Sequence, residues 1–173
     1  MVMSTTALVP VEEYLRSSEK PNCEYREGSL YPKPMPTTFH GILELMLGMM
    51  LRKLGLQAAT EVTVRLSPTK YLVPDVIAAA VLQSPYPTEP VLLCCEILSP
   101  EDRIGTVFAK CDEYHAWGVP FCWVIDPVKR TAWEYHAGGD PARVTDALHA
   151  GEIAISVTEL FAALPTVTEP SAN

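Results

Sequence analysis

An apolar run that contains a single charge limits what this 173-residue chain can fold into. Between residues 91 and 98 every side chain is apolar except that of Glu96. Such a run predicts a central strand buried on both faces, with Glu96 on the same face as Cys94 and Leu98. An ionised carboxylate there needs a cation, hydrogen-bond donors or a solvated cleft. A carboxylate at the strand end that reaches solvent or a helix N-terminus is the open alternative to a functional one.

The rest of the pattern predicts an α/β chain with a mixed central sheet. A strand, a helix at residues 101–117 that ends at Gly118, and a second buried strand at 121–126 follow one another in the middle of the chain. Further strands are predicted at residues 22–26, 29–32, 57–66, 73–81 and 131–135, and helices at 10–17, 38–53 and 157–164.

Composition limits the class of protein. The chain has 13 Lys+Arg against 21 Asp+Glu, a net charge of −8, and 48% hydrophobic residues. These values exclude a disordered tail, and we expect one domain over residues 1–173 with flexible ends at 1–10 and 165–173. The negative charge argues against non-specific coating of nucleic acid, but not against a nuclease, because carboxylates that bind a metal contribute to it.

Several absent signals point to the cytoplasm. No charge-free apolar run approaches the roughly 18 residues that a membrane span needs, and the N-terminal residues show no secretory signal. The five cysteines are an odd number, and Cys94 and Cys95 lie in the apolar run. This usage predicts reduced thiols in a cytoplasmic protein.

The helix predicted at residues 38–53 is apolar almost all round. Such a helix is buried on most sides, either within its own domain or against another subunit. Because two-fold dimers are the commonest soluble oligomers, we expect a homodimer.

A second carboxylate, Asp75, follows Pro74 at the start of another predicted strand. Two carboxylates that enter a sheet on different strands can bind a hard divalent ion such as Mg²⁺. The alternative is that Asp75 only solvates the start of its strand.

Short motifs in order along the chain resemble those of one family. They are Pro74-Asp75-Val76, Cys95-Glu96-Ile97-Leu98-Ser99-Pro100, Lys110 with Tyr114, Gly118-Val119, and Cys122-Trp123-Val124-Ile125-Asp126-Pro127. From about residue 11 to about residue 164, the chain is similar to a large bacterial family of restriction-endonuclease-like proteins within the PD-(D/E)XK nuclease superfamily. The resemblance implies a restriction-endonuclease-like core, in which helices flank a mixed central β-sheet with a metal site at one edge.

The resemblance also implies roles for single residues. Asp75 matches the superfamily Asp and Glu96 the superfamily Asp/Glu, and both would bind the metal, with Glu24 as a further ligand. The usual Lys two residues after the second acid is replaced by Leu98 in this chain. The family tends to supply that Lys from the next helix, where Lys110 is the matching residue.

Helical geometry bears on Lys110 independently. With 100° per residue, Lys110 lies beside the apolar stripe that contains Val107 and Cys111, so its side chain can reach back to the sheet. Snorkelling to solvent is the alternative. Supporting roles are predicted for His40, which matches a frequent His of the family, and for Ser99 and Arg103. As alternatives, His40 can pair with Glu44 one turn away, and Ser99 can cap the next helix.

The favoured function is hydrolysis of phosphodiester bonds in nucleic acid, with DNA expected by analogy and Mg²⁺ or Mn²⁺ as cofactor. Lys110 would orient the attacking water or neutralise charge on the phosphate. A non-catalytic binding or assembly protein that retains the nuclease fold is the main alternative, and a hydrolase of another substrate is a third. Contact with nucleic acid would be weak and would come from a local basic patch: Arg52, Lys53, Arg65, Lys70, Arg103 and Lys110.

Overall fold

The computed structural model of the chain describes residues 8–18 and 22–166. The ends that the sequence predicts to be flexible fall largely outside these ranges, at 1–7 and 167–173. Among the described helices, none combines the length and apolarity that crossing a membrane requires.

Glu96 lies in the middle of a six-stranded mixed sheet, as the apolar run predicts. The strand order is β10-β9-β8-β7-β6-β3. Strands β7 and β8 are parallel and are connected through helix α3, whereas the other neighbouring pairs are antiparallel. The bounds are β3 Gln57–Thr60, β6 Val76–Ala79, β7 Leu93–Ile97, α3 Ile104–Trp117, β8 Phe121–Asp126, β9 Thr131–His136 and β10 Ala142–Val144.

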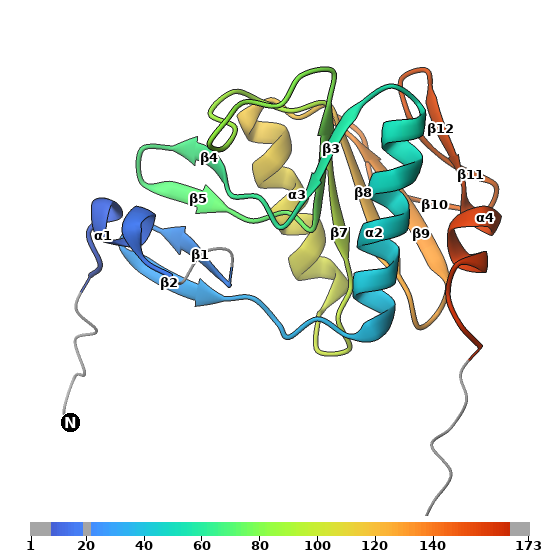
Figure 1. The fold of residues 1–173 in the computed structure, drawn as a ribbon, viewed down its shortest axis with the longest axis horizontal. Helices are drawn as coiled ribbons and strands as arrows, with labels where there is room; N and C mark the ends of the chain where they lie inside the picture. The colour runs from blue at the N-terminus through green and yellow to red at the C-terminus, as the bar shows by residue number, and fades with distance from the viewer. Residues whose placement is uncertain (1–7, 19–21, 167–173) are drawn as a thin grey trace, which may run out of the picture.

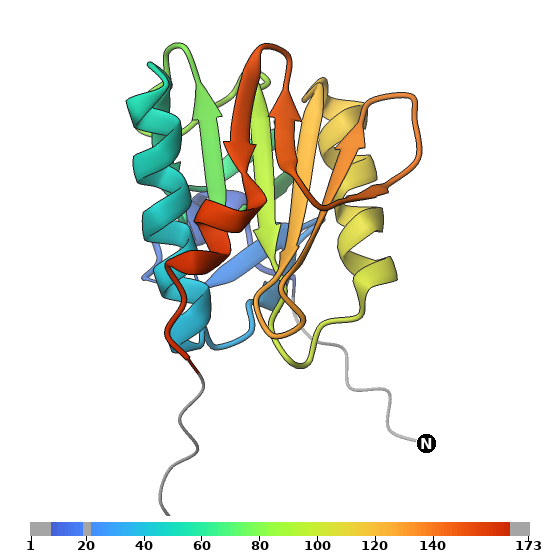
Figure 2. The ribbon, with the colours of Figure 1, turned by 90° about the vertical axis from the view of Figure 1, so that its right-hand side faces the viewer.

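Helices cover both faces of this sheet (Figure 2). Helix α2 (Thr38–Lys53) packs on one face through the fully buried Leu43, Leu47 and Leu51. The hairpin of β11 (Ala147–Ala150) and β12 (Ile153–Ser156) and helix α4 (Val157–Ala162) complete that core. Helix α3 packs on the opposite face, which is the face that Glu96 shares with Cys94 and Leu98.

A second, four-stranded sheet lies beside the first, at the left of Figure 1, in the order β2-β1-β5-β4. Its strands are β1 Cys23–Arg26, β2 Ser29–Pro32, β4 Val64–Ser67 and β5 Lys70–Leu72, and helix α1 (Val11–Arg16) packs against it. The rings of Tyr14, Tyr25 and Tyr71 form its own small core. This sheet directs β1 and the segment after β2 toward the start of β6.

Three sequence predictions are corrected. The single strand predicted at 57–66 is two strands in different sheets, because the chain turns at Glu61, where φ is +54°. The helix predicted from residue 101 begins at Ile104, since the chain forms a turn after Pro100. Of the strand predicted at 73–81, only β6 forms a strand, so Asp75 lies just before the first residue of β6.

Helix α2 is also less buried than its composition predicts. Leu45 is 62% exposed and Met49 is 56% exposed, on the face of the helix that points away from the sheet. The short strands β10, β11 and β12 were not predicted, because each has only three or four residues and little alternation.

Candidate functional site

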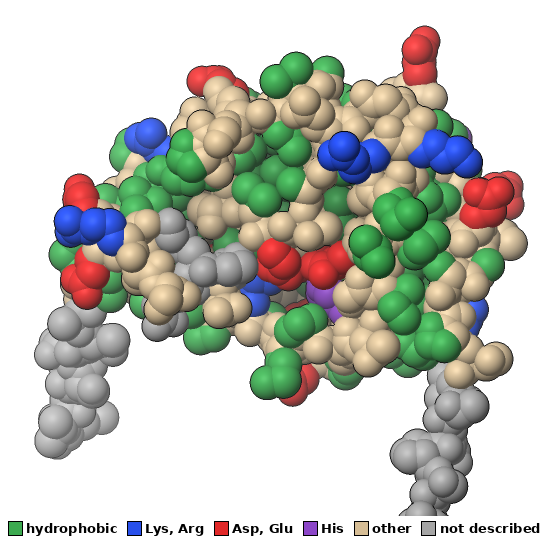
Figure 3. Space-filling model, viewed as in Figure 1, with side chains coloured by type: hydrophobic (Ala, Val, Ile, Leu, Met, Phe, Trp, Pro, Cys, Tyr) green, Lys and Arg blue, Asp and Glu red, His purple; other side chains and the backbone are tan. Residues whose placement is uncertain are grey.

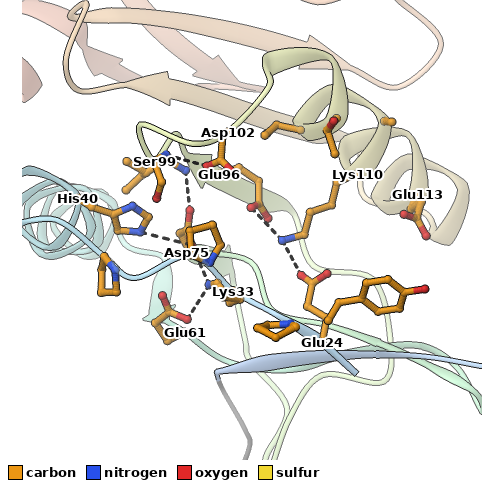
Figure 4. A pocket seen from close by; sticks show the side chains of 18 of the residues that line it. Glu24, Lys33, His40, Glu61, Asp75, Glu96, Ser99, Asp102, Lys110 and Glu113 are labelled. Atoms are coloured by element: carbon orange, nitrogen blue, oxygen red, sulfur yellow. Dashed lines mark hydrogen bonds and ion pairs between the residues drawn. The ribbon is translucent and has the colours of Figure 1, made fainter. Parts of the chain in front are cut away.

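Most of the site residues that the sequence predicts surround one pocket of about 450 Å³. It lies where the β1–β2 hairpin meets the N-terminal end of α2, the start of β6, the end of β7 and one side of α3. In the space-filling view, acidic and histidine side chains meet at a hollow on this face (Figure 3). Figure 4 shows the labelled side chains converging on the pocket from these elements and from the loops beside them.

Asp75 lies at one side of the pocket and is almost fully buried. Its Oδ2 atom accepts a hydrogen bond from the backbone N–H of Ile97 at 2.6 Å, which fixes the carboxylate against the end of β7. Its Oδ1 atom lies 2.8 Å from the ammonium of Lys33, which also donates to Glu61 at 2.7 Å. The Nε2 atom of His40 is 3.5 Å from the same Oδ1 atom and 3.5 Å from Oε1 of Glu44.

Glu96 lies at the other side and is held by a different set of partners. Lys110 reaches back from α3 and places its ammonium 2.9 Å from Glu96 and 2.6 Å from Glu24. The hydroxyl of Tyr114, one turn further along α3, donates to Glu96 at 2.7 Å. Glu24 also accepts the backbone N–H of Val73, so β1 is joined to the approach of β6.

Burial and charge act against each other in this pocket. Burial alone would raise the pKa of Asp75, but His40 and Lys33 outweigh it and hold that pKa below its ordinary range. Burial raises the pKa of Glu96, and the ammonium of Lys110 opposes the rise. Burial would lower the pKa of Lys110, but the carboxylates of Glu96 and Glu24 raise it. Burial would likewise lower the pKa of Lys33, but the carboxylates of Asp75 and Glu96 raise it, so Lys33 and Lys110 both stay charged.

Burial and neighbouring charges also shift the pKa of His40 in opposite directions. Burial would lower the pKa of its imidazole, but the carboxylates of Asp75 and Glu44 outweigh burial and raise that pKa to about 10. The ring is therefore an imidazolium at neutral pH in this arrangement.

One group of side chains in and beside the pocket could hold a metal ion. His40, Glu44, Glu61 and Asp75 each offer one ligand atom, and these atoms lie within 4.8 Å of one another. Three carboxylates and an imidazole are suitable ligands for a divalent cation. The metal ligands predicted from the sequence were Asp75, Glu96 and Glu24. Only Asp75 belongs to this group, because Glu24 and Glu96 lie around Lys110.

Six of the seven predicted site residues line the pocket. They are Glu24, His40, Asp75, Glu96, Ser99 and Lys110. Ser99 does so from the loop before α3, where its backbone N–H donates to Asp102. Arg103, which the sequence predicts as a supporting residue, is exposed, does not line the pocket and stands at the N-cap of α3.

Sequence reasoning missed Lys33, Glu61 and Asp102, which also line the pocket. Each lies in a loop outside the helices and strands, so no periodic pattern marks it. The Pro-Lys-Pro sequence around Lys33 was a local signal, because a charged residue between two prolines is held in an extended segment.

The basic residues expected to contact nucleic acid are scattered. Lys110 alone of the six expected residues lines the pocket, and Lys70 is paired with Glu113 at 2.9 Å. Lys53 lies about 20 Å along α2 from His40, at 1.5 Å per residue. The cations that do line the pocket besides Lys110 are Arg26 and Lys33.

The fold has a counterpart among solved structures. It matches the crystal structure of a "putative nuclease belonging to DUF820" from Anabaena variabilis ATCC 29413 with a TM-score of 0.74. The match covers 90% of this chain and 98% of that chain, at 21% sequence identity. At that identity the likeness establishes the fold, which is the mixed-sheet α/β core that the sequence predicts.

The family follows from a second comparison. The family model Uma2, described as "Putative restriction endonuclease", matches residues 11–165, so the chain belongs to this family. The resemblance inferred from the motifs around Asp75 and Glu96 is thereby confirmed. No curated protein matches the chain.

Proposed function

We propose that this protein is a metal-dependent nuclease that hydrolyses phosphodiester bonds in nucleic acid, with DNA as the expected substrate, in the cytoplasm. The observation that carries the proposal is the convergence of Asp75, Glu96 and Lys110 on one open pocket, in a chain of a restriction-endonuclease family. These three residues come from the start of β6, from β7 and from α3. Two acids and a lysine around a concave site are the groups that this chemistry needs.

Asp75 and Glu96 would hold one or two Mg²⁺ or Mn²⁺ ions, with Glu24 as a further ligand. The residues fit a divalent metal ion, because carboxylate oxygens crowd the pocket. His40 adds a buried imidazole nitrogen that has no hydrogen bond among the described residues. A bound divalent ion would acidify a water molecule and stabilise negative charge on the phosphate.

The protein's own groups would position the reacting atoms. Lys110 would orient the attacking water or neutralise charge on the phosphate from its place between Glu24 and Glu96. Tyr114 holds Glu96 through its hydroxyl, so that the carboxylate keeps one orientation. Ser99 and the backbone around it form the wall that a phosphate would approach.

A non-catalytic binding or assembly protein is the second candidate. The observation that favours it is that Lys110 is already engaged by two carboxylates, in a chain with a net charge of −8. Such a protein would keep the fold and the buried ion pairs without turnover.

We also propose a homodimer formed through α2. Leu45 and Met49 expose apolar surface there, and a Cβ atom added at Gly41 or Gly48 would meet nothing within 4 Å. An exposed apolar strip of this kind suits a second copy of the same helix. Light scattering at micromolar concentration tests the proposal, and a monomer would contradict it.

The decisive assay for activity uses purified protein with supercoiled, linear and single-stranded DNA and with RNA, each in Mg²⁺ and in Mn²⁺. We expect cleavage of at least one substrate that stops when EDTA is added. Metal binding without cleavage of any of them would favour a hydrolase of another substrate. Absence of both would favour the binding protein.

A further inference from the structure

The part of the pocket around Asp75 has features that the predicted nuclease residues do not explain. His40, Glu44 and Glu61 crowd Asp75, and the candidate ligand atoms of the four side chains lie within 4.8 Å of one another. Glu44 and Glu61 belong to neither the predicted metal ligands nor the predicted catalytic residues. Three carboxylates held this close repel one another unless a cation lies among them.

His40 supplies an observation independent of the acids. The residue is only 5% exposed, and neither ring nitrogen meets the geometry of a hydrogen bond within the described residues. Its Nε2 atom lies 3.5 Å from one oxygen of Asp75 and 3.5 Å from one oxygen of Glu44. A buried imidazole aimed between two carboxylates at this distance is under-coordinated.

These separations suit a shared ion better than direct hydrogen bonds. Ligands bonded at about 2.1 Å to one octahedral ion lie about 3.0 Å apart when adjacent and about 4.2 Å apart when opposite. The two separations of 3.5 Å from His40 fall inside that range. An imidazole among carboxylates favours a borderline cation such as Mn²⁺ over the harder Ca²⁺.

In the structure, the ammonium of Lys33 lies among the same oxygens. It is 2.8 Å from Oδ1 of Asp75, the atom that His40 approaches, and 2.7 Å from Oε2 of Glu61. Because Oδ2 of Asp75 accepts the N–H of Ile97, a divalent ion bound to Asp75 would take Oδ1, the oxygen that Lys33 contacts. The ammonium and the ion therefore exclude each other.

Lys33 lies at the edge of the pocket, where its side chain can rotate away from Asp75 and Glu61. It follows the last residue of β2, between Pro32 and Pro34, and the chain has no regular structure before α2 begins at Thr38. Its side chain is 13% exposed and borders the open pocket. Lys110, by contrast, projects from the middle of α3.

We propose that His40, Glu44, Glu61 and Asp75 form a binding site for a divalent cation of the Mn²⁺ type, and that the ammonium of Lys33 competes with this cation for it. Cation binding releases the proton that His40 carries without metal, because a ligating imidazole is neutral, and it displaces Lys33 into the pocket, where the freed ammonium faces any bound phosphate. The inference deepens the proposed function, because contact between the freed ammonium and a phosphate rests on the protein being a nuclease. The competition itself does not require cleavage.

Calorimetric titration of the full chain with Mn²⁺ tests the competition. Replacing Lys33 by Met removes the competing charge, so we expect Lys33→Met to bind Mn²⁺ about tenfold more tightly than wild type. Lys33→Arg keeps a cation and should stay within about threefold of wild type. Lys129→Met is the control, because its side chain is 78% exposed and outside this pocket, and it should leave the affinity unchanged.

Pulsed electron paramagnetic resonance of bound Mn²⁺ tests the ligand set. We expect modulation from an imidazole nitrogen in wild type and in Lys33→Met, and its loss in His40→Gln. Circular dichroism confirms that each variant is folded before titration.

The outcomes separate this inference from the proposed function. Equal or weaker Mn²⁺ binding by folded Lys33→Met overturns the competition, and the absence of nitrogen modulation from bound Mn²⁺ overturns the site. Failure of both wild type and Lys33→Met to bind Mn²⁺ overturns both parts of the inference. Tighter binding by Lys33→Met without cleavage of any nucleic acid supports the site and counts against the nuclease.

Discussion

The pocket has two sides that neutralise buried carboxylates in different ways. On the Glu96 side, Lys110 and Tyr114 project from one rigid helix and hold Glu24 and Glu96 at hydrogen-bond distance. On the Asp75 side, the nearest cation is Lys33, from a loop, and His40 stays 3.5 Å from two carboxylate oxygens. The first side is fully paired within the protein, whereas the second has ligand atoms to spare.

This difference indicates which charges hold the fold and which can change partners. An ion pair anchored on regular elements on both sides is costly to break, because each partner is left buried and unpaired. A pair that includes a loop lysine can be exchanged for another cation at lower cost. The pairs on the Glu96 side therefore hold its carboxylates in place, and the Asp75 side offers ligand atoms that an ion can reach without breaking the Lys110 pairs.

The largest expected effect is from Lys110→Met. This change leaves Glu24 and Glu96 without their ammonium, and we expect it to lower the free energy of unfolding by about 3–5 kcal/mol. Urea denaturation at neutral pH measures it. Adding Glu96→Gln to Lys110→Met should recover part of the loss, because it removes one of the unpaired charges.

Two further lysine variants provide comparisons for the loss of stability in Lys110→Met. Lys70→Met breaks a pair with Glu113 in which both side chains are a quarter to a third exposed, so the cost should be below about 1 kcal/mol. Lys33→Met should fall between Lys70→Met and Lys110→Met. A loss for Lys33→Met as large as that for Lys110→Met would mean that the two sides of the pocket do not differ.

His40 should make stability depend on pH. Its pKa is raised from 6.5 to about 10, so its stabilising effect is fully present below about pH 6.5 and is lost as the pH rises through about 10. With EDTA present, wild type should exceed His40→Gln by about 2 kcal/mol near pH 6 and by little near pH 10. Urea denaturation at both pH values measures this, and a constant difference would show that folding does not raise the pKa of His40.

Tyr114→Phe should have a smaller effect than Lys110→Met or His40→Gln. It removes the hydroxyl that donates to Glu96 at 2.7 Å and leaves the buried ring in place. We expect a loss of about 1.5 kcal/mol, the scale of one hydrogen bond to a charged group. Tyr135→Phe, a change near the surface, serves as the control and should stay within about 0.5 kcal/mol of wild type.

The sequence predicts the Glu96 side of the pocket better than the Asp75 side. Strand β7 and helix α3 have clear periodic patterns, so the position of Lys110 one helix after Glu96 follows from local geometry. Lys33 and Glu61 come from loops that only the packing of two sheets brings beside Asp75. No local pattern encodes that approach.

The lack of a local sequence pattern also explains the incorrect predictions of secondary structure and site residues. The stretch at 57–66 contains no Gly or Pro, yet the chain turns at Glu61 to pass from one sheet to the other. Arg103 was taken as a helical residue near the site, but the loop after β7 delays the start of α3. Helix composition alone did not show which side of α2 faces the sheet, because apolar residues lie on both sides.

The most direct test of the account is nucleic-acid cleavage by wild type and by Asp75→Asn, purified side by side and assayed in Mn²⁺. Asn keeps the shape of the side chain and an oxygen that can accept the N–H of Ile97, so the fold should persist while the charge is lost. We expect wild type to cleave only with metal, and Asp75→Asn to bind Mn²⁺ weakly and to lose about a hundredfold or more in rate. Equal cleavage by the two proteins would show that the activity does not belong to this pocket and would contradict the account.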